Sequence, residues 1–127
     1  MTVEEIKAYC LSKPGAYLDY PFGEVPACVK VCKRLFAQLY PRREDCKITL
    51  NCEVMAGEFF RGLYPGSVVR GYHCPPNQQP YFNTVLLNGA VPDAELKNMI
   101  DHSYATVVGK LPKKKQRELT DGTAQQE

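Results

Sequence analysis

The chain has 127 residues, of which 44% are hydrophobic and 24% are charged, and its formal net charge is +2. This length suits a single domain with its own core, and no apolar run approaches the roughly 18 residues that a membrane helix needs. Met1 leads directly into a polar, helix-like segment, so we expect no signal peptide, no membrane partner and a cytoplasmic location. So small a net charge does not indicate a class of partner.

Cysteine is frequent for a chain of this length, with six residues: Cys10, Cys28, Cys32, Cys46, Cys52 and Cys74. Small disulfide scaffolds are shorter and poor in helix signals, so we expect reduced thiols. Two thiol pairs, Cys28 with Cys32 and Cys46 with Cys52, lie within 25 residues of one another. Zinc knuckles usually space their ligands about two to four residues apart, and the first pair falls in a strand pattern. We therefore predict no metal site and no cofactor.

The N-terminal third alternates between helix and strand signals. Thr2 and Glu5 form a capping-box pattern, which predicts a helix that ends at Lys13-Pro14-Gly15. Segment 16–26, AYLDYPFGEVP, predicts an ordered loop that lays its aromatic side chains over the edge of the domain. From Ala27 the apolar period changes to two, which predicts antiparallel strands over 27–32, 35–40 and 47–52. The first two strands would form a hairpin with a basic tip at Lys33-Arg34.

The remainder of the chain predicts a second helix and the principal helix of the fold. Segment 53–64 has an apolar side made of Val54, Met55, Phe59, Phe60 and Leu63. A strand over 67–73, an exposed loop CPPNQQP (74–80) and a strand over 81–87 follow. After the Asn88-Gly89 turn, Pro92 opens a helix that runs to Leu111. The residues of its apolar face recur at intervals of three and four residues: Leu96, Met99, Ile100, Ser103, Tyr104, Val107, Val108 and Leu111.

The domain organisation is one domain over residues 1–112 and a tail over 113–127. The tail begins with Lys113, Lys114 and Lys115 and then becomes polar without an apolar period. It predicts a short solvated helix and disorder from about Thr120. No internal repeat is visible.

Several motifs in this order resemble the MmcQ/YjbR family of small bacterial proteins. They are YPFGE (20–24), LYPG (63–66), GYH (71–73), FNTV (82–85), PDAEL (92–96) and SYATVVGKLPKK (103–114). The resemblance covers about residues 2–116. It departs from the family pattern at Phe82, where members typically carry Trp, and in the longer, proline-rich link between GYH and that aromatic residue.

The resemblance implies a frataxin-like (CyaY-like) α+β fold, with an antiparallel sheet of about five strands, helices packed on one face and the other face open. Family members are commonly labelled DNA-binding because the sheet and its projecting hairpins resemble a double-wing motif, an argument from fold alone. The family pattern offers no catalytic residues, so we expect a protein that is not an enzyme, and we favour a monomer.

The first functional hypothesis is DNA binding through the open sheet face and the basic hairpin tips. Basic side chains at turns and strand ends could contact phosphates, and neighbouring side chains could stack on bases or form hydrogen bonds. The phosphate candidates are Lys30, Lys33, Arg34, Arg42, Arg43 and Lys47. The candidates near them are Gln38, Arg70, Tyr72, His73 and Asn83. Charged turns also keep hairpin tips soluble, which is their ordinary role.

An alternative from another class is a module that binds a protein or a small ligand. Its sequence feature is the aromatic and proline content of the Pro75–Phe82 loop beside the exposed sheet face. Iron handling by analogy with frataxin is disfavoured, because Glu4 and Glu5 are balanced by Lys7 and Lys13. An enzyme is disfavoured because His73 and His102 lack a nucleophile motif, and we interpret His102 as a surface or capping residue.

Overall fold

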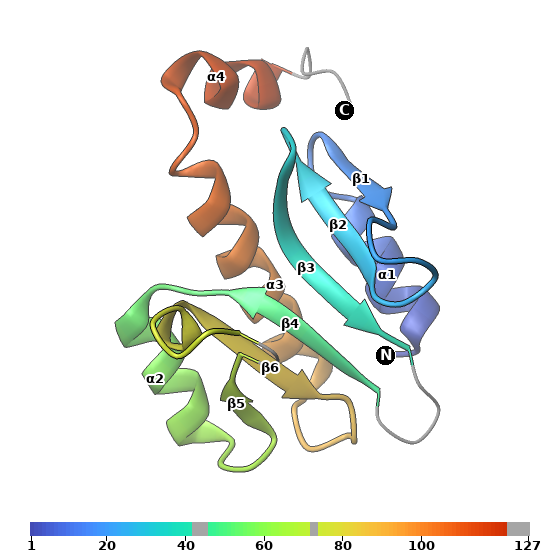
Figure 1. Ribbon diagram of the computed structural model, residues 1–127, viewed down its shortest axis with the longest axis vertical. Coiled ribbons are helices and arrows are strands. Elements are labelled where there is room, and N and C mark those ends of the chain that lie inside the picture. Colours follow the sequence, from blue (N-terminus) through green and yellow to red (C-terminus); the bar gives the residue numbers. More distant parts are fainter. Residues whose placement is uncertain (42–45, 72–73, 122–127) are drawn as a thin grey trace.

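The computed structural model describes residues 1–41, 46–71 and 74–121 (Figure 1). These described residues form four α-helices and six strands. The helices are α1 (Val3–Leu11), α2 (Val54–Leu63), α3 (Asp93–Val108) and α4 (Lys113–Asp121). The strands are β1 (Ala16–Asp19), β2 (Ala27–Val31), β3 (Arg34–Tyr40), β4 (Lys47–Asn51), β5 (Val68–Arg70) and β6 (Phe82–Leu86), with a short 3₁₀ helix, η1 (Gln79–Tyr81), before β6.

The strands form one sheet in the order β1-β2-β3-β4-β6-β5, and every neighbouring pair is antiparallel. The predicted α+β class and antiparallel sheet are confirmed, with six strands in place of about five. The additional strand is β1, which the sequence predicted as part of a loop. Its four residues pair with β2 from Ala16 opposite Val31 to Asp19 opposite Cys28.

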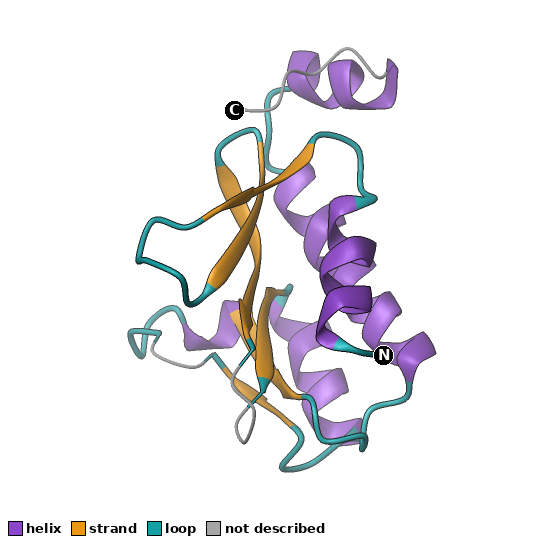
Figure 2. Ribbon diagram, turned by 90° about the vertical axis from the view of Figure 1, so that its right-hand side faces the viewer, coloured by secondary structure: helices purple, strands orange, loops and turns teal. Residues whose placement is uncertain are grey.

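One face of the sheet is covered by helices (Figure 2). Helix α3 packs mainly on β3 and β4, which lie near the middle of the sheet. The predicted apolar face of α3 is confirmed, because Leu96, Met99, Ile100, Ser103 and Val107 are buried in it. These side chains meet the inward residues of the strands, among them Phe36, Leu39, Ile48, Leu50 and Val85.

Helix α2 packs differently from the prediction. Its buried residues are Gly57 and Phe60, whereas Met55, Phe59 and Leu63 are 83%, 62% and 48% exposed. The predicted packing of these three side chains is therefore wrong. The reason is that the helix turns its glycine toward the protein: a Cβ on Gly57 would lie 2.7 Å from Cys52 Sγ. Close approach of the backbone on this side leaves the stripe at i, i+4 and i+8 facing solvent.

Helix α4 extends the ordered chain past Pro112. The predicted solvated helix in the tail is present, but its Leu119 is buried and belongs to the hydrophobic core. The prediction of disorder from about Thr120 does not hold for Thr120, which lies within α4, and residues 122–127 lie outside the described residues. Among the described residues, no helix is long and apolar enough to cross a membrane.

Candidate functional site

A cleft of about 530 Å³ opens on the sheet face that lies away from the helices. The floor of the cleft comes from β3, β4 and β6, and its two walls come from segments that are far apart in the sequence. One wall is the β1–β2 loop and the other is the segment before β6; both project from the sheet on the side opposite α1 and α3 (Figure 2). The lining residues are Phe22, Val25, Pro26, Leu35, Gln38, Tyr40, Lys47, Cys74, Pro75, Gln78 and Phe82.

Lys47 lies at the floor of the cleft and is only 5% exposed. It is paired with Tyr40 across β3 and β4, and its Nζ lies 5.8 Å from the centre of the Tyr40 ring. An ammonium at this distance from an aromatic ring is attracted by the electron density on the ring face. Lys47 also makes a further interaction within the protein. The charge is therefore held in place at the floor instead of extending into solvent as predicted for a phosphate contact.

The wall before β6 is fixed by a close backbone approach and by hydrogen bonds. A Cβ on Gly71 would lie 2.5 Å from Cys74 Sγ and 2.8 Å from Phe82 Cβ, so a larger residue has no room there. Gln79 Nε2 donates to the Cys74 carbonyl at 3.2 Å. The Gln78 N–H donates to the Pro75 carbonyl at 2.9 Å. The predicted exposed loop is present, with residues 75–78 exposed, and its internal hydrogen bonds hold it as a wall of the cleft.

Cysteines of the cleft region lie in positions that favour the neutral thiol. Cys74 lines the cleft, and burial raises the pKa of its thiol. Burial likewise raises the pKa of Cys28, which is fully buried on β2. The thiolate is the reactive form of cysteine, so neither position favours nucleophilic chemistry. Among the described residues, no group of three or more His, Cys, Asp or Glu side chains could hold a metal ion.

Lys30 and Asn83, both predicted DNA contacts, have structural partners. Lys30 Nζ forms an ion pair with Asp19 Oδ2 at 2.7 Å, across the β1–β2 pair. Asn83 is 3% exposed; its Oδ1 accepts from Arg61 Nη1 at 2.6 Å and its Nδ2 donates to the Gly57 carbonyl at 3.2 Å. Asn83 therefore lies beneath α2, on the helix-covered face, and the expectation that it serves the open face is wrong.

The other predicted residues are scattered over the molecule. Gln38 lines the cleft, and Arg70 is exposed on β5, at the edge of the sheet. Arg42, Arg43, Tyr72 and His73 lie outside the described residues. His102, interpreted from the sequence as a surface or capping residue, is half-buried on α3, and its Nε2 accepts a hydrogen bond from the N–H of Glu53, the residue before α2, at 3.2 Å.

The β2–β3 hairpin tip carries the remaining two predicted contacts, and both are exposed. Its turn residues are Cys32 and Lys33, with φ of 48° and 67°, and Arg34 begins β3. Positive φ at both central positions is the mark of a type I′ hairpin turn. The turn therefore lies one residue earlier than Lys33-Arg34, where the sequence analysis placed it.

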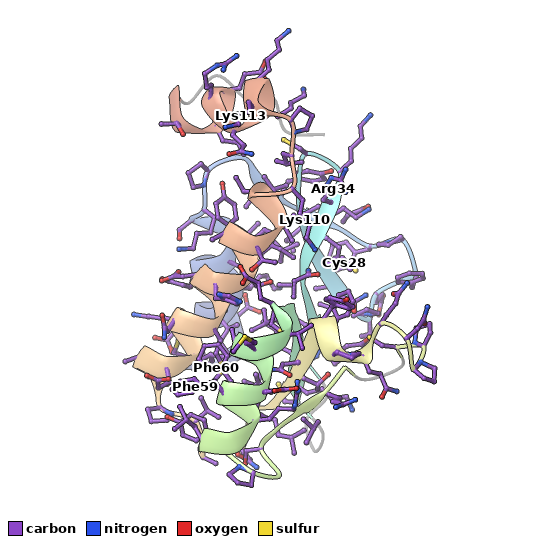
Figure 3. All side chains as sticks on the ribbon, turned by 90° about the vertical axis from the view of Figure 1, so that its left-hand side faces the viewer. Cys28, Arg34, Phe59, Phe60, Lys110 and Lys113 are labelled. Atoms are coloured by element: carbon purple, nitrogen blue, oxygen red, sulfur yellow. The ribbon has the colours of Figure 1, made fainter. Side chains whose placement is uncertain are left out.

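Basic side chains gather at the end of the molecule to which this hairpin points. Both ribbon views place α4 at the same end as the hairpin tip (Figures 1 and 2). Arg34 begins β3, Lys113 begins α4, and Lys110 lies in the connection between α3 and α4 (Figure 3). A groove of about 260 Å³ is lined by Arg34, Leu35, Asn51, Val107 and Lys110. We call this surface the basic end; its residues are Lys33, Arg34, Lys110, Lys113, Lys114, Lys115 and Arg117, all of them exposed.

The sequence analysis did not predict that the two walls of the cleft lie together, or that the hairpin tip lies at the same end as the basic tail. The walls of the cleft join residues near position 22 to residues near position 78, and no local pattern connects them. The basic tail was visible as a charge run, and the hairpin tip was visible as a turn. Their proximity depends on α3, which carries the chain back to the end where β2 turns into β3.

Comparison with known proteins agrees with the resemblance noted in the sequence. The sequence model of the YjbR family matches residues 11–106. The Escherichia coli K12 protein named "Uncharacterized protein YjbR" is 28% identical over 119 residues, which cover 94% of this chain and 98% of that protein.

Solved structures show the same fold. The crystal structure of Deinococcus radiodurans protein DR2400 matches with a TM-score of 0.84 and 27% identity, over 94% of this chain and 88% of that chain. A protein from Pseudomonas syringae shares the fold with a TM-score of 0.65 and 20% identity, over 81% of this chain and 96% of that chain. With three quarters of its length matched by the family's sequence model, the chain belongs to the YjbR family.

Proposed function

We propose that the protein binds DNA, and that the basic end carries the contact. The observation that supports this proposal is the convergence of exposed cations from the hairpin tip, the connection after α3, and α4. Between Lys110 and Asp121 the chain has five basic and two acidic residues. One of these acids, Glu118, faces Lys115 at 3.6 Å on the same helix. A surface that gathers positive charge in this way is the usual electrostatic footprint of a phosphate-binding protein.

The proposal moves the contact away from the open sheet face. Lys47 is buried at the floor of the cleft, and Lys30 is paired with Asp19. A phosphate backbone needs cations that it can reach from solvent, and the basic end offers them on protruding elements. Contacts of this kind position a nucleic acid without reading its sequence, so we expect little sequence preference.

The test is a fluorescence-anisotropy titration with labelled double-stranded and single-stranded DNA at several salt concentrations. Each phosphate contact contributes roughly 0.9 to the slope of log K against log salt for duplex DNA. The variant Lys114→Ala/Arg117→Ala should therefore bind more weakly and lower that slope by about 2.

A matched control removes the same charge elsewhere. Lys7→Ala/Lys97→Ala also loses two cations, but Lys97 lies near the start of α3, about 16 Å along the helix from Val108 at its other end. This control should keep the parental salt slope. Equal weakening by the two variants would mean that only net charge matters, and an absence of binding at low salt would reject the proposed function.

The alternative hypothesis, a module that binds a small ligand or a protein at the open face, is favoured by a separate observation. The open face is not flat but is hollowed into a walled cleft. That cleft leads to a different proposal, which does not depend on DNA binding.

A further inference from the structure

The cleft on the open face has the dimensions of a small-molecule site. Its volume of about 530 Å³ lies within the roughly 300–1,000 Å³ that is usual for pockets that bind small molecules. Its walls come from two separate loops, and its floor comes from the sheet. The hydrogen bonds and the close approach at Gly71 hold one wall in place without a ligand. A preformed site of this kind avoids the cost of ordering a loop upon binding.

The apolar part of the lining is aromatic. Phe22 from the β1–β2 loop, Tyr40 from β3 and Phe82 from β6 all contribute to it. Phe22 is 71% exposed, an unusual state for a phenyl side chain with nothing packed over it. Aromatic rings prefer stacked or edge-on partners that are also aromatic, and such pairs contribute beyond the area they bury. The lining therefore favours a ligand that has a ring.

The polar part of the lining favours a negative charge. Among the described residues that line the cleft, Lys47 alone carries a formal charge, and it is only 5% exposed. Gln38 and Gln78 add side-chain amides, whose N–H groups can donate to an oxygen anion. One fixed cation with amide donors fits a single carboxylate better than a chain of phosphates, which usually takes several cations or a loop of backbone N–H groups.

We propose that the cleft binds a small aromatic carboxylate, with its ring against Phe22, Tyr40 and Phe82 and its carboxylate toward Lys47. The position of the ammonium beside the Tyr40 ring places positive charge and aromatic surface next to each other, as such a ligand requires. The hydrogen-bonded wall and the rim at Phe22 then enclose the ring. Binding is non-covalent and involves no proton or electron transfer.

The experiment uses the full chain, labelled with ¹⁵N, and two probes of the same shape: 2-naphthoate, which is an anion, and 2-naphthamide, which is neutral. Titrations followed by amide chemical shifts give both the affinity and the location of each probe. The expected result is saturable shifts at the cleft-lining residues with 2-naphthoate, and binding of 2-naphthamide that is at least tenfold weaker. Shifts that are spread over the surface, or equal affinity for the two probes, would overturn the proposal.

Three variants examine the two halves of the site. Lys47→Met keeps the apolar stem and should weaken 2-naphthoate at least tenfold, without changing the affinity for 2-naphthamide. Lys47→Arg keeps the charge and should retain most of the binding. Because Lys47 is buried, Phe22→Ala provides a second variant at an exposed position, where we expect the fold to tolerate the change. It should weaken both probes about fivefold, and unchanged binding by Phe22→Ala would contradict the role of the aromatic wall.

Separate variants test DNA binding at the basic end and carboxylate binding in the cleft. Lys114→Ala/Arg117→Ala should bind 2-naphthoate with parental affinity, and Phe22→Ala should keep its salt-dependent binding of DNA. If loss of the basic end also removed binding of 2-naphthoate, the anion would be bound by that surface and the cleft proposal would be wrong.

Discussion

Ser103 joins the main helix to two central strands at once. Its Oγ donates to the carbonyl of Phe36 in β3 at 2.5 Å, and it accepts a hydrogen bond from the N–H of Asn51 in β4 at 2.9 Å. The side chain is fully buried. A buried hydroxyl that satisfies two backbone groups from different strands fixes the position of α3 over the sheet, because the buried Phe36 carbonyl has no water as a substitute partner.

Replacement of Ser103 by alanine should lower the free energy of unfolding by about 1–3 kcal/mol, because a buried carbonyl and a partly buried N–H would lose their partner. Urea unfolding followed by circular dichroism measures this change. Ser12→Ala is the matched control: Ser12 Oγ also donates to a carbonyl, that of Tyr9 at 2.6 Å, but at an exposed position. A loss as large in the control as in Ser103→Ala would show that burial is not the cause.

The sequence predicted those elements whose signals are local. Helix α3 followed from apolar residues spaced by three and four, and Leu96 and Val107 are buried as that spacing requires. The helix ends at Val108, three residues before the predicted end at Leu111. Strand β1 was missed because its four residues lie between a Gly-containing turn and a Pro-rich loop. It is a strand because Ala16 pairs with Val31 on β2, which is a non-local relationship.

The candidate sites were harder to predict, because they are built from residues that are far apart in the sequence. Asn83 was assigned to the open face, but β6 places it opposite Leu50 on the helix-covered face, where it holds α2. A shift of one residue along a strand exchanges the two faces, and one sequence does not reveal which face is covered. Phe22 was predicted only to cover an edge, because its role in the cleft depends on a wall more than fifty residues away.

Two glycines of α2 should respond to alanine with opposite signs. A Cβ on Gly57 would meet Cys52 Sγ at 2.7 Å and Arg61 Nη1 at 3.1 Å, whereas nothing lies within 4 Å of a Cβ on Gly62. Gly57→Ala should destabilise the fold by about 1–3 kcal/mol through overpacking. Gly62→Ala should stabilise it by about 0.5–1 kcal/mol, because alanine favours a helix over glycine. Thermal unfolding of the two variants measures both effects, and a loss of stability in each would show that the space around Gly62 is not open.

The contact between α1 and α3 should make stability depend on pH in acid. Asp101 accepts hydrogen bonds from Tyr9 Oη at 2.6 Å and from Lys13 Nζ. Burial alone would raise the pKa of the Asp101 carboxyl, but the hydrogen bonds from Lys13 and Tyr9 outweigh it, so the pKa is lowered. A lowered pKa in the folded state gives stability that is present above the unfolded pKa, about 3.9, and is lost as the pH falls through the folded value.

Asp101→Asn should therefore cost up to about 1 kcal/mol at pH 7, a modest value because the pair is partly exposed to solvent. The difference from the parent should shrink as the pH falls below about 4. Urea unfolding at a series of pH values measures it, and the double variant Lys13→Met/Asp101→Asn isolates the pair. If Asp101→Asn cost the same at pH 7 and at pH 2.5, the contribution would not depend on the charge.

Substitutions at Lys33 in the β2–β3 turn should change the stability of the protein and its affinity for DNA independently. Lys33 has a φ of 67°, a conformation that costs a non-glycine residue about 1 kcal/mol. Lys33→Gly should therefore stabilise the protein by up to about 1 kcal/mol while it weakens binding to DNA, because one cation of the basic end is lost. Lys33→Ala loses the same cation but keeps the strain, so it should weaken DNA binding equally without the gain in stability. Unfolding and anisotropy measurements on the two variants test both halves, and unchanged DNA affinity in both would remove the hairpin tip from the proposed surface.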